Sequence, residues 1–220
     1  MKVIYPSVII YTHGRTGNDI LECIEEYGRT CYKSENGITD TSSSSFIRNI
    51  IRRGHLSVIE HEKITARLIC DRGVTHEIVR HRIGSYSQES TRYCNYGGKD
   101  IEFIRPCFWL DEDNSEEQYK YVNWYNAMLF AEQAYHKLID HGATPQEARS
   151  VLPNSLKTEI VITYNLREWR HFFELRCDKA SHPQMRQVAK MLLSLISNHI
   201  PIIFDDLKEK YLNEDSDGHT

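Results

Sequence analysis

The sequence predicts an α+β fold, in which a mixed or antiparallel sheet is combined with a long central helix. Strand-like and helix-like segments alternate irregularly, unlike the regular succession of a repeating βαβ sheet. Segment 115–141 keeps helical spacing throughout, and at about 1.5 Å per residue it would span roughly 40 Å. The 220 residues contain no internal repeat and no long linker. We therefore expect a single domain over residues 1–220, with a frayed polar tail at 211–220.

Residues 1–54 are expected to form one strand and then two helices. The apolar residues of segment 1–14 predict the strand. Segment 19–32 places isoleucine, leucine and tyrosine side chains along one side of a helix. The Asp-Thr-Ser sequence at 40–42 can cap a second helix. Gly54 is expected to end that helix, because glycine readily adopts the left-handed conformation found there.

The middle of the chain is expected to combine short strands with the long helix. In segment 63–70 apolar side chains alternate with polar ones, which predicts a strand with one buried face. Segment 73–82 has the spacing of a short helix that leads into a loop, and segment 101–104 is a second short strand. In segment 115–141 aromatic and aliphatic residues recur every three or four positions. Such a stripe is typical of a core or of a subunit interface.

The last part of the chain is predicted to add one strand and three helices. The Thr-Pro-Gln-Glu sequence at 144–147 has the pattern of a capping box at the start of a short helix. Segment 156–164 alternates as a half-buried strand should. Asn165 can cap a helix that runs to Cys177, and a further helix is predicted at 184–199.

Composition limits the classes of protein to which this chain can belong. Hydrophobic residues make up 40% and charged residues 26%, as in ordinary globular proteins. No apolar run approaches the roughly 18 residues of a membrane span, and the N-terminus lacks the features of a signal peptide. The six cysteines are scattered without a CxxC pair, which argues against a zinc site and against a disulfide framework. We therefore expect a cytoplasmic protein with reduced cysteines.

The segment from Asp71 to Gly98 is the most informative, because it concentrates basic and hydroxyl side chains after the predicted short helix. It contains Arg80, Arg82 and Arg92 together with serines, a threonine and several glycines. Arginine binds phosphate and carboxylate oxygens in bidentate fashion, and hydroxyls and backbone N–H groups can complete an anion site. The whole chain has a formal net charge of -4. The segment therefore indicates a discrete site for a small anion and not a broad nucleic-acid surface.

Three further clusters carry less information when each is taken alone. His55 and His61 are six positions apart and have no obvious third ligand, so no metal site is expected. Arg149 stands near the end of a short helix, where arginine commonly interacts with the helix dipole. Arg167 and Arg176 are nine residues apart on one predicted helix and therefore project from opposite faces. Either they are surface arginines, or a ligand or another subunit lies on each side.

Together, the four clusters resemble one family closely, the flavin-dependent thymidylate synthases. The matches run in the same order as in that family, from about His55 to Arg186, and cover most of the chain. They are Gly54, His55, Glu60 and His61; Arg80, His81, Arg82, Ser85, Ser90, Arg92 and Tyr93; Arg149, Leu152 and Pro153; and Asn165, Arg167, Leu175 and Arg176. The chain departs from the commoner pattern of the family at Glu77 and at residues 180–186.

The resemblance implies that the protein methylates deoxyuridine monophosphate (dUMP) reductively, giving thymidylate (dTMP). The carbon would come from methylenetetrahydrofolate and the reducing hydride from NADPH, through bound FAD. The implied fold is the α+β fold of this family. The implied assembly is a homotetramer whose active sites are built from several subunits. Nucleic acids and membranes are not expected as partners.

The same resemblance implies the site residues, position by position. The residues expected to bind dUMP are Gln88, Glu89, Ser90, Thr91, Arg92, Arg149 and Arg176. Arg176 and Ser90 are also expected to take part in catalysis, Arg176 by stabilising negative charge that develops on uracil and Ser90 as a hydrogen-bonding residue. The residues expected to bind FAD are His55, Ser57, Arg80, His81, Arg82, Asn165 and Arg167.

Two alternatives remain open at this point. Pro106-Cys107 superficially matches the nucleophile of cysteine-dependent thymidylate synthases, although no neighbouring His or Asn supports it. An RNA-binding module would place Arg80, Arg82 and Arg92 on phosphates and stack bases on the nearby Tyr86, Tyr93 and Tyr96. The net negative charge and the lack of a wider basic track count against it. A yellow colour of the purified protein would separate these hypotheses, because only the flavin hypothesis predicts it.

Overall fold

The structure is a computed structural model that describes residues 1–111 and 113–213. The chain divides into two compact units, which are described separately. Unit 1 comprises residues 1–7, 68–80 and 87–160, and unit 2 comprises residues 8–67, 81–86 and those from 161 onward. Four strands contribute residues to both units: β2 (Ser7–Tyr11), β3 (Lys63–Asp71), β4 (Ser85–Gln88) and β6 (Lys157–Asn165). The expectation of a single domain stays a prediction.

The strands form two sheets, and their pairing confirms the predicted α+β class. The four-stranded sheet has the order β2-β3-β6-β4, where β2 is Ser7–Tyr11. In the other sheet β1 (Lys2–Ile4) pairs in parallel with β5 (Glu102–Ile104), and an antiparallel bridge joins Phe103 to Leu156. In β3 every second residue from Ile64 to Cys70 is buried, so the alternation read from the sequence gives the correct buried face.

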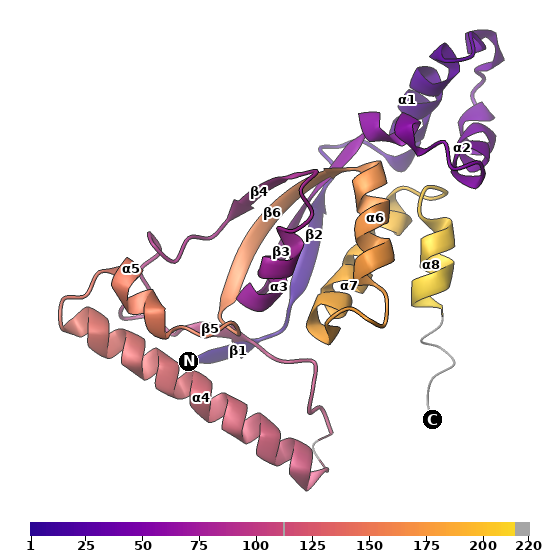
Figure 1. Ribbon diagram of the computed structural model, residues 1–220. Helices are drawn as coiled ribbons and strands as arrows, with labels where there is room; N and C mark the ends of the chain where they lie inside the picture. The colour runs from indigo at the N-terminus through magenta and orange to yellow at the C-terminus, as the bar shows by residue number, and fades with distance from the viewer. Residues whose placement is uncertain (112, 214–220) are drawn as a thin grey trace. The chain divides into compact units, whose positions relative to one another are not determined.

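Unit 1 contains the long helix, α4 (Ser115–Asp140), which packs against α5 (Pro145–Ala148) and a 3-10 helix, η3 (Arg149–Val151) (Figure 1). Helix α3 (Arg72–Ile78) follows β3. The capping box predicted at Thr144 and Glu147 is present. The hydrophobic core of this unit consists of Ile101, Phe103, Met128, Tyr135, Ala148 and Leu156. Of the apolar stripe predicted on α4, only Met128 and Tyr135 are buried in the described chain.

Unit 2 is built around α6 (Leu166–Arg176), which packs against η2 (Leu56–His61), α7 (Pro183–His199) and α8 (Asp205–Leu212). Helix α1 (Gly17–Thr30) packs against α2 (Ser42–Arg52) and against the 3-10 helix η1 (Glu35–Gly37) (Figure 1). An aromatic cluster fills the core beside α6 and is made of Tyr164, Trp169, Phe172, Phe173 and Phe204.

Four sequence-based predictions of local structure are corrected by the fold. The strand predicted at 1–14 is interrupted after Ile4 and continues as β2, because Pro6 has no N–H to donate to a ladder. The segment predicted as a loop after α3 contains β4, at an edge of the larger sheet. The helix predicted at 73–82 ends at Ile78. The frayed tail predicted at 211–220 is wrong at its start, since Tyr211 is buried in α8; residues 214–220 lie outside the described residues.

No helix in the described part of the chain combines the length and the apolar character that a membrane span requires.

Candidate active site

Helix α6 presents the two arginines that the sequence places on opposite faces. The side chain of Asn165 caps the helix by accepting a hydrogen bond from the backbone N–H of Glu168, at 2.8 Å. The buried indole N–H of Trp169 donates to the carbonyl oxygen of Ile64, at 3.0 Å. The cap fixes where α6 begins and the indole bond fixes its rotation, so the directions of Arg167 and Arg176 are set by the fold.

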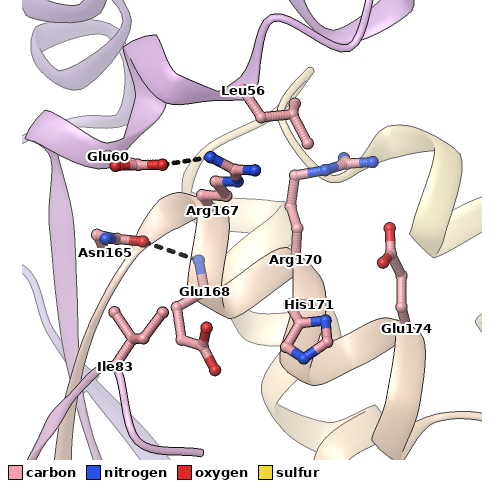
Figure 2. A pocket seen from close by; sticks show the side chains of 9 residues that line it. All are labelled: Leu56, Glu60, Ile83, Asn165, Arg167, Glu168, Arg170, His171 and Glu174. Carbon is pink, nitrogen blue, oxygen red and sulfur yellow. Dashed lines mark hydrogen bonds and ion pairs between the residues drawn. The ribbon is translucent and has the colours of Figure 1, made fainter.

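Arg167 lies where two cavities of unit 2 adjoin. Its guanidinium forms an ion pair with Glu60 of η2, at 2.5 Å, and both side chains are largely exposed (Figure 2). One cavity, of about 490 Å³, is lined by Leu56, Glu60, Ile83, Asn165, Arg167, Glu168, Arg170, His171 and Glu174. The other, of about 380 Å³, also includes Leu56 and Arg167 and adds His55 and Ser57. Four of the seven residues expected to bind FAD thus line these two cavities.

A chain of hydrogen bonds connects Glu168, His81 and Arg176. Nδ1 of His81 is 3.0 Å from Oε1 of Glu168, and Nε of Arg176 donates to Nε2 of His81, also at 3.0 Å. His81 and Glu168 are 5% and 6% exposed. Burial lowers the pKa of His81, so its neutral form is favoured. Neither ring nitrogen is available to a flavin, and the flavin contact expected of His81 would require one of these bonds to break.

His81, Glu168 and His171 bring their possible metal-ligating atoms within 4.8 Å of one another. The sequence did not predict this cluster, because its members come from the 81–86 segment and from α6. Both ring nitrogens of His81 already take part in hydrogen bonds, and the Arg176 guanidinium contacts one of them. A cation held by His81 would face this guanidinium, which opposes metal binding. The geometry therefore favours a hydrogen-bonded cluster.

The backbone around the Arg-His-Arg sequence is held by two tyrosines of unit 2. The Tyr86 hydroxyl donates to the carbonyl oxygen of His81 and is 2.7 Å from the Tyr164 hydroxyl. Gly84 lies directly on the ring of Tyr164, since a Cβ atom there would be 2.3 Å from two ring carbons. This close approach needs glycine and keeps the segment from His81 to Tyr86 against β6. Arg82 is exposed.

In unit 1, most of the residues expected to bind dUMP lie on β4 and just after it. The Gln88 side chain donates to the hydroxyls of Thr75 and Thr158, at 2.9 and 3.2 Å. Glu89 accepts from the Tyr96 hydroxyl at 2.7 Å and pairs with Lys157 at 3.2 Å. These two side chains are thus committed to internal contacts, so contacts with a nucleotide would compete with them.

Thr91 and Arg149 are brought together in unit 1, where Nη1 of Arg149 is 3.3 Å from the Thr91 hydroxyl. Both line a cavity of about 460 Å³ that also includes Arg72 and His76. The sequence reasoning missed Arg72 and His76, which carry no motif signal.

Ser90 is half-buried, and its hydroxyl accepts a hydrogen bond from the backbone N–H of Arg92. The exposed guanidinium of Arg92 lies 5.5 Å from the ring of Tyr93. Arg80 is also exposed and belongs to unit 1.

Comparison with known proteins identifies the family. Residues 13–202 match the family model described as thymidylate synthase complementing protein. The flavin-dependent thymidylate synthase of Geobacter sulfurreducens is 35% identical over 185 residues, which are 81% of this chain and 78% of that protein. The chain belongs to the flavin-dependent thymidylate synthase family. The flavin-dependent thymidylate synthase of Pyrococcus furiosus is 33% identical, over 77% of this chain and 69% of that protein.

Membership makes this protein an enzyme, a methyltransferase whose family is named for its dependence on a flavin. Of the two alternatives left open by the sequence, neither the cysteine-dependent synthase nor the RNA-binding module agrees with this family. A solved structure also shares the fold: that of a UMP/dUMP methylase, PolB, from Streptomyces cacaoi, bound with 5-Br dUMP. It aligns with a TM-score of 0.77 at 23% identity, over 96% of this chain and 98% of PolB.

Proposed function

We propose that this protein converts dUMP to dTMP by reductive methylation, with methylenetetrahydrofolate as the carbon donor and NADPH as the reductant, through bound FAD. One observation carries the proposal. In a chain that belongs to the flavin-dependent thymidylate synthase family, signature residues from separate parts of the sequence, His55, Asn165 and Arg167, line two adjoining cavities. A cytoplasmic location and reduced cysteines accompany this proposal.

The residues present fit a flavin dinucleotide. The two cavities lie in the volume range of ligand sites, and a ligand with two ring systems could occupy both. Nε of Arg170, which lines the larger cavity, is buried without a hydrogen-bond partner among the described residues. His55, Ser57, Asn165 and Arg167 would hold the cofactor, and exposed Arg80 and Arg82 would add charge. When bound, FAD would relay the reducing hydride.

The protein would hold the nucleotide chiefly with arginines. Arg149, with the Thr91 hydroxyl beside it, offers a donor pair for the phosphate, and Arg92 and Ser90 would add to it. Arg176 would donate to a uracil oxygen and stabilise negative charge on the ring as C5 becomes nucleophilic. Its direction is already set by His81, so no reorganisation is needed when the substrate binds.

The proposed assembly is a homotetramer that shares its active sites between subunits. One line of support is that Arg167 and Arg176 of α6 contact different residues, Glu60 and His81. Another is that Tyr119 and Phe130 of α4 are about 70% exposed in the isolated chain. Large exposed aromatics on one helix are typical of interfaces. Light scattering should give a mass near four times 25.8 kDa. A fully active monomer would contradict the shared site.

The flavin is tested by the visible absorbance of the purified protein and by the mass of the cofactor released on denaturation. We expect a yellow protein that releases FAD. A colourless protein that cannot be reconstituted with FAD would overturn the proposal, and release of a mononucleotide flavin would correct the cofactor only.

A further inference from the structure

We propose that Glu168 and His81 are positioning residues for Arg176: Glu168 holds the imidazole of His81 so that its Nε2 lone pair receives the Nε–H of Arg176. The inference rests on the proposed function, in which Arg176 contacts the nucleotide. It adds two residues to that site that would not touch the substrate, and it assigns His81 a role other than the flavin contact implied by the resemblance.

The hydrogen-bond directions fix the tautomer of His81. Arginine Nε carries a hydrogen and has no acceptor capacity, so Nε2 of His81 must be the acceptor in the 3.0 Å contact with Arg176. The single hydrogen of the neutral ring must then be on Nδ1, where it can donate to the Glu168 carboxylate at 3.0 Å. A carboxylate that accepts a hydrogen bond from one ring nitrogen of histidine commonly determines that the other nitrogen is an acceptor.

The surroundings of His81 make this arrangement sensitive to its partners. The charged or titratable groups that face the ring are Glu168, His171 and Arg176 of α6 and Tyr164 of β6. The ring centroids of His171 and Tyr164 lie 5.8 and 6.2 Å from that of His81. Phe172 covers the ring at 5.0 Å. Little water can therefore replace a lost partner, because His81 is only 5% exposed.

Loss of the Glu168 carboxylate would release the imidazole to exchange tautomers. With hydrogen on Nε2, a donor would face the Nε–H donor of Arg176 and the bond would be lost. Protonation of His81 has the same effect and adds repulsion between two cations. Because the pKa of His81 is lowered from its ordinary value of 6.5, the neutral ring persists at pH 7 and is lost only as the pH falls below 6.5.

The test measures the dUMP affinity of the flavin-loaded protein across pH for variants of Glu168 and His81. Glu168→Ala should weaken binding at pH 7.5 by about tenfold, and Glu168→Gln by less, because its amide oxygen can still accept from Nδ1. In His81→Gln the side-chain oxygen can replace Nε2 as an acceptor for Arg176. We expect this variant to bind dUMP well. It should also lack the loss of affinity that the unaltered protein should show as the pH falls below 6.5 and His81 becomes protonated.

Glu25→Ala is the matched control, because Glu25 is also buried, on α1, and bonded to Arg29 and Ser42. It should reduce stability without changing dUMP affinity in the folded fraction. Adding Glu168→Ala to Arg176→Ala should have no further effect on affinity. An Arg176→Ala protein that binds dUMP normally would refute the proposed contact with the nucleotide. If that variant binds poorly but Glu168→Ala binds normally, or if His81→Gln keeps the acid loss, the positioning role is refuted.

Discussion

Replacing Arg176 by alanine should separate nucleotide binding from flavin binding. In the structure Arg176 contacts His81, whereas the side chains that line the two proposed flavin cavities include Arg167 on the opposite face of α6. A hydrogen bond from a charged group contributes roughly 1.5–3 kcal/mol. At about 1.4 kcal/mol per tenfold, dUMP affinity should fall roughly ten- to a hundredfold.

The same substitution has a calculable effect on stability. It leaves Nε2 of His81 as a buried acceptor without its donor, which costs about 1–3 kcal/mol. Denaturant unfolding of the flavin-free protein should show this loss. Arg48→Ala serves as the control, because Arg48 is an exposed residue that pairs weakly with Asp205, at 3.6 Å, and should change neither quantity by more than about 0.5 kcal/mol.

Both ligands are measured on one Arg176→Ala sample, the flavin by absorbance and dUMP by calorimetric titration. We expect near-normal flavin content and weakened dUMP binding. Loss of the flavin with retention of dUMP binding would refute the assignment of the two faces of α6.

Three further predictions concern residues outside this contact. Cys107→Ser should keep most activity, because the reaction proposed needs no enzyme thiol; a folded, flavin-loaded but inactive variant would revive the cysteine-dependent mechanism. Gly84→Ala should destabilise the protein by about 1–3 kcal/mol in denaturant unfolding, since its Cβ would be 2.3 Å from ring carbons of Tyr164, and an unchanged midpoint would show that this contact can relax. Burial raises the pKa of Cys177 to about 12, so in the native protein at pH 8 it should resist alkylation that exposed Cys31 undergoes; mass spectrometry of the labelled peptides checks this.

Local signals in the sequence were sufficient for most of the fold. The caps at Asn165 and Thr144 locate the starts of α6 and α5, because a capping side chain acts within three residues of its own position. The alternation in β3 also identifies its buried face, because successive side chains of a strand point to opposite faces of the sheet. Strand β4 was missed because its Ser-Tyr-Ser-Gln sequence is polar, and its place at the edge of the sheet depends on pairing with β6, distant in the chain.

The candidate site was predictable where it rests on motifs and not where it rests on contacts between distant residues. His81 is 87 residues from Glu168 and 95 from Arg176, so no periodicity relates them. Glu168 also stands three residues after the N-cap of α6, a position at which an acidic residue is ordinarily explained by the helix dipole. Only the fold shows that its carboxylate is buried against a histidine.

Formation of dTMP from dUMP tests the central claim most directly. The purified protein is incubated with dUMP, isotopically labelled methylenetetrahydrofolate and NADPH, and the nucleotides are analysed by mass spectrometry. We predict dTMP that carries the labelled carbon and whose formation requires both the bound flavin and NADPH. A flavin-loaded, correctly assembled protein that yields no dTMP, or that forms it equally well without flavin, would contradict the account.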